Sequence, residues 1–221
     1  MKFSTTEENY LKAVYYLQGQ HGNVSTNALA ARLQSKPASI TDMMKKLSNK
    51  KLLNYKPYYG FSLTTDGKKV ALSVIRKHRL WEFFLAEKLN IGWDEVHGIA
   101  EELEHVSSKK LIDKLDAFLD YPAFDPHGDP IPDKLGKMQK SNKIPLTNLK
   151  LSTPAKVISI SNPKPNVVEI LKEKKITVGT LVEVKRVFDF DHSLQVKIAA
   201  SKTETISKQL ANMIFVSDVD V

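Results

Sequence analysis

The spacing of apolar residues differs between the first and last parts of this chain, and that difference limits the folds open to it. Over most of the chain up to about residue 119, apolar residues recur three or four positions apart, as at Tyr10, Val14 and Leu17, which is the spacing of a helix with one buried face. From about Pro154, apolar and polar residues alternate, as in Lys156–Ile160, which is typical of strands. We therefore expect a mainly α chain with a β-rich C-terminal domain that forms a small barrel.

The N-terminal part predicts a winged helix-turn-helix. Helices are expected after the capping sequence Ser4–Glu8, after Ser25, and after a break at Gln34–Pro37. Two short helices joined by a tight break are typical of a helix-turn-helix. Two short strands then flank the turn Pro57–Gly60, which adds the hairpin wing.

Two longer helices are expected next, near 65–89 and 94–119. Beyond Tyr121 the chain is rich in proline and polar residues as far as Pro145, which predicts a loop and linker rather than a packed element. A helical turn is expected at Val167–Leu171, between strands. The chain then divides into a winged helix-turn-helix, a two-helix domain, a linker and a barrel, at residues 1–73, 74–140, 141–153 and 154–221.

Charge is unevenly distributed along the chain. The net charge is +8, which favours an anionic partner such as nucleic acid. The segment Arg32–Tyr58 contains seven Lys or Arg residues and one acid, Asp42, whereas Leu89–Ser108 contains five acids and no Lys or Arg. These two neighbouring regions therefore have opposite electrostatic character.

Composition excludes several classes of protein. There is no cysteine, so disulfides and thiolate chemistry are impossible and any transition-metal site must use His, Asp, Glu or main-chain oxygens. No run approaches the ~18 apolar residues of a membrane-spanning helix, and the N-terminus lacks the apolar core of a signal peptide. Glycine-rich phosphate loops and a nucleophile elbow are also absent. We expect a cytoplasmic protein with no membrane partner and no organic cofactor.

Histidine and glutamate recur at helical spacing in the two longer helices. The residues concerned are His78, Glu82, His97, Glu101, Glu104 and His105. Within each helix they lie three or four positions apart, which places side chains on one face with Cβ atoms about 5–6 Å apart. Three imidazoles and three carboxylates from two adjacent helices predict a metal site.

Helical His/Glu spacing also occurs in proteins of other kinds. Single His/Glu pairs are found on solvated helix faces that bind nothing. A di-metal hydrolase would use such a cluster to activate water, but it leaves the basic segment unexplained. A metal-independent winged-helix regulator explains the basic segment but not the His/Glu spacing. The remaining histidines, His21, His127 and His192, are expected at a helix end, in a loop bonded to main chain, and in a β-turn.

The third helix and the hairpin after it carry the basic segment. Ile40, Met43, Met44 and Leu47 form an apolar stripe. The opposite face offers short hydroxyls that can reach base edges and lysines that neutralise phosphates. We therefore expect this region to bind double-stranded DNA. The candidate contact residues are Ser35, Lys36, Pro37, Ala38, Ser39, Thr41, Asp42, Lys45 and Lys46 in the helix-turn-helix, and Lys56, Tyr58 and Tyr59 in the wing.

Several short motifs occur together in this chain. They are Leu63–Gly67, Arg76–Leu80 with Glu82, Val96–His97, Glu104–Val106 and His127–Pro132. Together they resemble the diphtheria-toxin-repressor family of metal-dependent transcriptional regulators. The resemblance covers the whole chain, strongly over residues 1–135 and loosely in the β-rich tail.

This resemblance implies a winged helix, a metal-binding and dimerisation domain, and a C-terminal domain similar to an SH3 barrel of the FeoA kind. Members of the family are homodimeric repressors rather than enzymes. They bind Mn²⁺ or Fe²⁺ and then palindromic operators of metal-uptake genes. The positions that match the family's two metal sites are His78, Glu82 and His97 for the ancillary site, and Glu101, Glu104, His105 and Asn9 for the primary site.

Three positions depart from the family's patterns. Glu101 stands where the iron-type branch has cysteine, and a harder oxygen donor suits Mn²⁺. Asn9 and Lys12 stand where the manganese-type branch has an aspartate and a glutamate. The barrel ligands of the iron-type site have no clear equivalents in Pro163–Val167. We expect Mn²⁺, with Fe²⁺ as the alternative, and expect the metal to fix the separation of two recognition helices.

Overall fold

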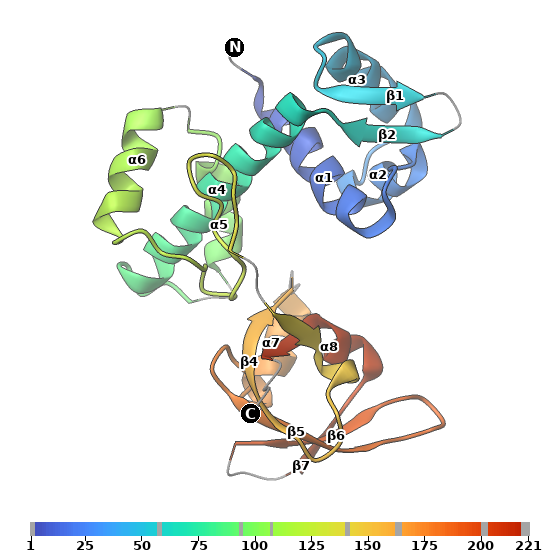
Figure 1. Ribbon diagram of the computed structural model, residues 1–221, viewed down its shortest axis with the longest axis vertical. Helices are drawn as coiled ribbons and strands as arrows, with labels where there is room; N and C mark the ends of the chain where they lie inside the picture. Colours follow the sequence, from blue (N-terminus) through green and yellow to red (C-terminus); the bar gives the residue numbers. More distant parts are fainter. Residues whose placement is uncertain are drawn as a thin grey trace. The chain divides into compact units, whose positions relative to one another are not determined.

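The computed structural model (Figure 1) describes residues 3–56, 59–92, 95–106, 108–139, 142–161, 165–199 and 203–217. The chain divides into two compact units. The first comprises Met1–Trp81, Ala100–Phe118 and Pro132–Met138, and the second comprises Glu82–Ile99, Leu119–Ile131 and Gln139–Val221. Among the described residues, no helix is long and apolar enough to cross a membrane.

Three helices open the first unit, α1 (Thr5–His21), α2 (Thr26–Leu33) and α3 (Pro37–Asn49). Each begins where the sequence predicts a start. The Ser4 hydroxyl accepts a hydrogen bond from the Glu7 backbone in a capping box, Ser25 caps α2 in the same way, and Pro37 occupies the first turn of α3. These local interactions satisfy backbone N–H groups that have no partner inside the helix.

The wing is a two-stranded antiparallel hairpin of β1 (Leu53–Lys56) and β2 (Gly60–Leu63). Phe61 of β2 is buried and also pairs with Val24 in an isolated bridge, which joins the hairpin to the segment before α2. The helices and the hairpin share one core, whose largest fully buried side chains are those of Leu11, Leu29, Ile40, Met44, Leu47 and Phe61. The predicted winged helix-turn-helix is therefore confirmed.

Three further helices follow, α4 (Thr65–Glu87), α5 (Val96–Leu103) and α6 (Lys109–Phe118). The prediction of one helix over 94–119 is wrong, because the chain breaks between α5 and α6. A tighter turn from Leu103 to Val106 ends α5, with a backbone hydrogen bond of 3.1 Å, and the Ser108 hydroxyl accepts from Leu111 N at 3.3 Å to begin α6. Glu104 and His105 consequently lie in a turn and not on the helix face that carries Glu101.

The C-terminal part of the second unit is a β-rich domain. In the described chain its strands are β3 (Lys143–Pro145), β4 (Pro154–Ile160), β5 (Leu181–Val187), β6 (Leu194–Ile198), β7 (Thr203–Ile206) and β8 (Ile214–Ser217). They form an antiparallel sheet in the order β3-β8-β4-β5-β6-β7. The helices α7 (Pro165–Glu173) and α8 (Lys208–Met213) complete the domain. Alternate strand residues such as Val157, Val184 and Val196 face its core, which confirms the predicted β pattern and the helical turn at 167–171.

The predicted linker at 141–153 is wrong over part of its length. Residues 143–145 form β3, which pairs with β8, and a 3-10 turn (Leu146–Asn148) follows. Leu146 is fully buried in the core of the β-rich domain. The polar composition of residues 141–153 did not indicate a strand, because the strand that pairs with β3 lies about 70 residues further along the chain.

The loop before β3 packs closely against β4 within the second unit. Gly128 has φ +79°, and a Cβ at this position would lie 1.7 Å from the carbonyl oxygen of Ile158. Only glycine tolerates both conditions. The Ile160 backbone N–H donates to the His127 carbonyl oxygen at 2.9 Å, so this loop and its histidine are held in a defined position.

Candidate functional site

Side chains of α4 and α5 form a group with metal-ligand chemistry. His78 and Glu82 lie one turn apart on α4, which is a single continuous helix, and His97 lies in the first turn of α5. One ligand atom from each residue lies within 4.8 Å of the others. His78 and Glu82 are buried and His97 is exposed. Two imidazoles and one carboxylate at this spacing fit a divalent transition metal, with His97 on the side open to solvent.

Glu82 has two histidine neighbours. Its Oε1 atom lies 3.0 Å from His97 Nδ1 and 3.5 Å from His127 Nε2. Burial alone would lower the pKa of His127, but the carboxylates of Glu82, Asp125 and Asp129 outweigh burial and raise it. His127 was expected to bond main chain, but its side chain lies against the Glu82 carboxylate of the candidate metal group. Sequence reasoning missed this contact because no helical spacing relates a loop histidine to Glu82.

A second group contains most of the residues that match the primary site. Glu104 is almost fully buried, and its Oε2 lies 2.7 Å from His78 Nδ1. His105 Nε2 lies 3.4 Å from Glu104 Oε1, and His105 Nδ1 lies 2.6 Å from Glu8 Oε2. The structure thus brings His78, Glu104 and His105 together and adds Glu8, which the sequence offered only as the neighbour of Asn9.

Lys12 and Lys77 are cations of this second group, and the Lys77 ammonium lies 3.7 Å from Glu8 Oε2. Lys12 is the one that contacts Glu104. Its ammonium lies 2.7 and 2.8 Å from the two carboxylate oxygens of Glu104 and 3.7 Å from Glu101 Oε1. Burial would raise the pKa of Glu104, but His78 and Lys12 outweigh burial and lower it. Glu101 is half exposed, and Asn9 is half-buried on α1. Glu101 and Glu104, which were predicted to bind metal, are therefore paired with the Lys12 ammonium in this structure.

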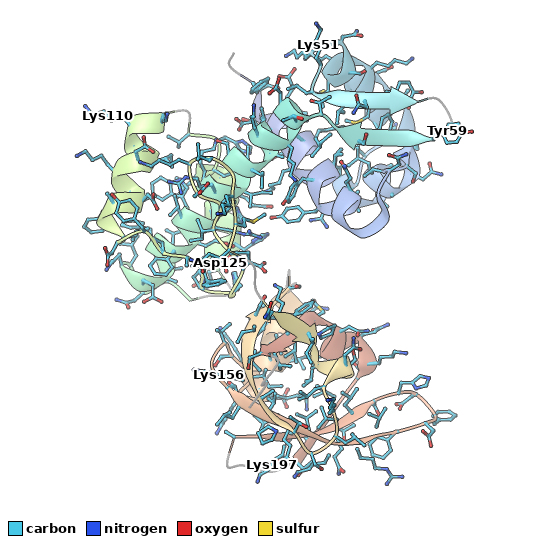
Figure 2. All side chains as sticks on the ribbon, viewed as in Figure 1. Lys51, Tyr59, Lys110, Asp125, Lys156 and Lys197 are labelled. Atoms are coloured by element: carbon cyan, nitrogen blue, oxygen red, sulfur yellow. The ribbon has the colours of Figure 1, made fainter. Side chains whose placement is uncertain are left out.

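The outer face of α3 is the candidate nucleic-acid surface. Lys36, Pro37, Ala38, Ser39, Asp42, Lys45 and Lys46 are exposed there, and Ser35 and Thr41 are partly exposed. The Thr41 hydroxyl donates to the Pro37 carbonyl oxygen at 3.0 Å, so it is engaged within the helix. In the wing, Tyr59 is 75% exposed at the hairpin turn (Figure 2). Tyr58 and the side chain of Lys56 lie outside the described residues.

Glu7 connects α1 to this helix. Its buried carboxylate lies 2.6 Å from Lys50 Nζ and 3.1 Å from Lys46 Nζ. Burial would raise the pKa of Glu7, but the hydrogen bonds from Lys50 and Lys46 outweigh burial and lower it to about 2. Lys46, predicted only as a DNA contact, therefore also has an ion pair within the protein. The capping pattern that identified Glu7 could not show its second role.

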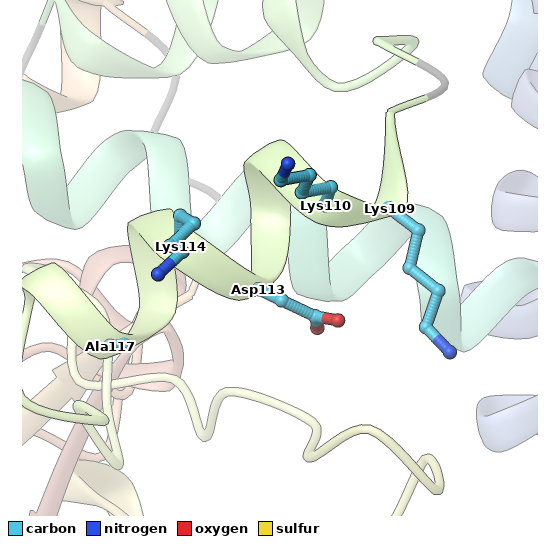
Figure 3. A pocket seen from close by; sticks show the side chains of 5 residues that line it. All are labelled: Lys109, Lys110, Asp113, Lys114 and Ala117. Carbon is cyan, nitrogen blue, oxygen red and sulfur yellow. The ribbon is translucent and has the colours of Figure 1, made fainter.

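A separate basic surface lies along α6. A surface depression of about 430 Å³ is lined by Lys109, Lys110, Asp113, Lys114 and Ala117, whose side chains are shown in Figure 3. Lys134 lies 3.5 Å from Asp113 beside it. The depression contains none of the candidate metal ligands.

A winged helix-turn-helix with an exposed basic helix, followed by helices that carry a His/Glu cluster, defines a class of metal-responsive DNA-binding proteins. Comparison with known families agrees with this class along almost the whole chain. Residues 2–61 match the N-terminal DNA-binding domain of iron-dependent repressors, 64–133 match the metal-binding and dimerisation domain of those repressors, and 144–218 match the FeoA domain. The chain belongs to the iron-dependent repressor family, which is the diphtheria-toxin-repressor family.

Individual relatives support this membership. The chain is 32% identical over 127 residues to the iron-dependent repressor IdeR of Mycobacterium leprae, a match that spans 58% of this chain and 55% of that relative. It is 32% identical over 114 residues to the transcriptional regulator MntR of Oceanobacillus iheyensis, covering 52% of this chain and 77% of that relative. Among solved structures, a manganese-dependent transcriptional repressor in complex with manganese superposes with a TM-score of 0.88 at 30% identity, over 96% of this chain and 99% of the other. The relatives are metal-dependent transcriptional repressors.

Proposed function

We propose that this chain is a homodimeric, Mn²⁺-activated repressor, with Fe²⁺ as the alternative metal, that binds a palindromic operator and controls genes of metal-ion uptake in the cytoplasm. The observation that carries the proposal is the grouping of His78, Glu82 and His97 within 4.8 Å on helices that follow a winged helix. Family membership supports the same function.

The proposed metal ligands are His78, Glu82, His97, Glu101, Glu104, His105 and Asn9. The set contains imidazole nitrogens and carboxylate or amide oxygens but no thiolate, and such harder donors favour Mn²⁺ and Fe²⁺ over softer metals. Glu8, at 2.6 Å from His105, is an alternative to Asn9 as the ligand from α1. When bound, the metal supplies positive charge that holds these side chains together.

Helix α1 provides a route from these ligands to the DNA-binding surface. Glu8 and Lys12 of α1 contact the turn that contains Glu104 and His105. Glu7 contacts Lys46 of α3 and Lys50, which directly follows α3. A metal ion that rearranges the first contacts would shift α1 and, through it, α3. In a two-fold dimer the separation of the recognition helices must match the spacing of the half-sites, so a change in α1 would alter operator affinity without new base contacts.

The proposed roles of the domains follow the predicted domain boundaries. Residues 1–73 bind DNA through the exposed face of α3 and the wing, and residues 74–140 bind metal and dimerise. The DNA-contacting set is the one predicted, with Lys46 shared between DNA and Glu7. Residues 154–221 form the FeoA-like domain.

The test is operator binding as a function of metal. Fluorescence anisotropy with a labelled operator would compare metal-free protein with protein in Mn²⁺, anaerobic Fe²⁺, Zn²⁺ and chelator. We expect Mn²⁺ to raise affinity by roughly 5–150-fold, the range of ~1–3 kcal/mol typical of allosteric coupling. His78→Ala and His105→Ala should lose this response while remaining folded dimers.

The control is His192→Asn, because His192 is exposed in the β5–β6 turn with φ +56°, a conformation that asparagine tolerates. It should respond to Mn²⁺ as the wild type does. An unchanged Mn²⁺ response in both His78→Ala and His105→Ala would contradict the proposed site.

A further inference from the structure

The ammonium of Lys12 holds the position that a bound cation would take at two candidate ligands. It lies 2.7 and 2.8 Å from the oxygens of Glu104 and 3.7 Å from Glu101 Oε1. The Lys12 side chain is 14% exposed and that of Glu104 is 1% exposed. The contact joins residues 92 positions apart and fastens α1 to the turn after α5.

This pairing has a clear electrostatic cause. A buried carboxylate without a partner is strongly destabilising, and removal of one partner of a buried pair leaves an uncompensated charge. Lys12 contacts both oxygens of Glu104, and His78 Nδ1 approaches one of them at 2.7 Å. The buried carboxylate is therefore neutralised by groups of the protein itself.

We propose that Lys12 is an internal cation, which occupies the Glu101–Glu104 carboxylates in the metal-free protein and must withdraw before an ion binds there. This inference rests on the proposed function, since it concerns how the same ligands are regulated. A divalent ion and an ammonium cannot share one pair of carboxylates, because like charges at contact distance in a poorly solvated setting repel strongly. The flexible four-carbon stem of lysine allows the ammonium to move toward solvent.

Two consequences follow for metal binding. Lys12 weakens binding at Glu101, Glu104 and His105, so this group responds only at higher metal concentration. Because Lys12 opposes an ion at Glu101 and Glu104, we expect the group of His78, Glu82 and His97 to fill at lower metal concentration. Because Lys12 belongs to α1, its withdrawal also releases a contact of the helix that holds α3 through Glu7.

The experiment measures metal binding by the full chain without DNA. Isothermal titration with Mn²⁺ after chelator treatment, and thermal unfolding with and without Mn²⁺, would compare wild type with Lys12→Met, Lys12→Gln and Lys12→Arg. Both neutral variants should bind Mn²⁺ at the weaker step roughly tenfold or more tightly than wild type. Without metal they should unfold at lower temperature, and Mn²⁺ should raise that temperature by more than in wild type. Lys12→Arg keeps the cation and should remain close to wild type.

The matched control is Lys69→Met, which removes the same charge from an exposed lysine 3.1 Å from Asp66. It should titrate and unfold as wild type does. Glutamine keeps a hydrogen-bond donor for Glu104, so Mn²⁺ binding can still be measured in Lys12→Gln if Lys12→Met folds poorly.

The outcomes separate this inference from the proposed function. If wild type binds its operator in a Mn²⁺-dependent manner but Lys12→Gln titrates with Mn²⁺ as wild type does, the inference is overturned and the function stands. If the neutral variants bind Mn²⁺ more tightly but no metal changes operator binding, the function fails and the inference stands.

Discussion

At the scale of single residues, Glu101 is the accessible member of the proposed metal ligands at the primary site. Its side chain is 54% exposed, and it is 3.7 Å from Lys12, so it can be replaced without opening a cavity in the core. Its carboxylate is a hard oxygen donor at a position where the iron-type branch of the family has a thiolate. The proposed preference for Mn²⁺ can therefore be tested at a residue whose replacement should leave the fold intact.

We predict that Glu101→Cys lowers the ratio of Mn²⁺ to Fe²⁺ activation, because a thiolate favours softer metals. Operator binding measured with each metal under strictly anaerobic conditions tests this. Glu102→Cys, at the exposed neighbouring position, is the control and should keep the wild-type ratio. An unchanged ratio in Glu101→Cys would remove the physical basis for preferring Mn²⁺.

At the scale of elements, the first turn of α1 has two structural functions. The Glu7 carboxylate completes the capping box with Ser4 and pairs with Lys46 of α3 and with Lys50 just after it. The neighbouring residue Glu8 contacts His105. Adjacent positions of one helical turn therefore contact the recognition helix and the candidate metal ligands.

We predict that Glu7→Gln destabilises the winged helix by roughly 1–2 kcal/mol, since glutamine retains the cap but loses the charge in both ion pairs. The pKa of Glu7 is lowered from 4.5 to about 2. The stabilisation is therefore fully present above about pH 4.5 and is lost as pH falls toward 2. Denaturant unfolding across this pH range should show that the difference in free energy of unfolding between wild type and Glu7→Gln decreases as the pH falls.

Asp66→Asn is the matched control, because Asp66 is exposed and its ion pair with Lys69, at 3.1 Å on the same helix, is exposed as well. Asp66→Asn should change the free energy of unfolding by no more than about 0.5 kcal/mol. A pH-independent difference between wild type and Glu7→Gln would show that the ion pairs contribute nothing.

The recognition helix offers a second test at this scale, through neighbouring lysines with different partners. Lys45 is exposed, whereas Lys46 pairs with Glu7. We predict that Lys45→Ala lowers the salt dependence of DNA binding by about 0.9 in the log–log slope for each phosphate that is no longer neutralised, with stability unchanged. Lys46→Ala should lower both the slope and the stability. Equal slopes in wild type and both variants would place the DNA surface elsewhere.

At the scale of the whole molecule, dimerisation should depend on exposed apolar side chains of α6. Leu111 is 44% exposed and Phe118 is 65% exposed, and both lie within the match to a dimerisation domain at 64–133. Large exposed apolar side chains are typical of surfaces that a partner covers. Symmetric operator binding needs both recognition helices, so a monomer should bind weakly.

We predict that Phe118→Glu converts the dimer to a folded monomer and weakens operator binding by at least tenfold, a change of about 1.4 kcal/mol. Sedimentation equilibrium and anisotropy would measure the two effects. Phe190→Glu is the control, because Phe190 is fully exposed at the β5–β6 turn and should leave both unchanged. A Phe118→Glu protein that remains dimeric would exclude this face of α6.

The sequence by itself determined the parts of this protein that depend on near neighbours. Capping at Ser4 and Ser25, Pro37 at the start of α3 and the strand alternation after 154 involve residues a few positions apart, so the winged helix and the β-rich domain were predictable. The helical pair His78 and Glu82 was predictable for the same reason. The metal role of these residues stays a prediction.

Only the tertiary structure decided the contacts that span long stretches of chain. The pairing of β3 with β8 and the approach of His127 to Glu82 have no local signature. Lys50 meets Glu7 across 43 positions, and Lys12 meets Glu104 across 92. Periodicity shows which face of an element is buried, but the partner that a buried charge meets is set by how the elements pack together.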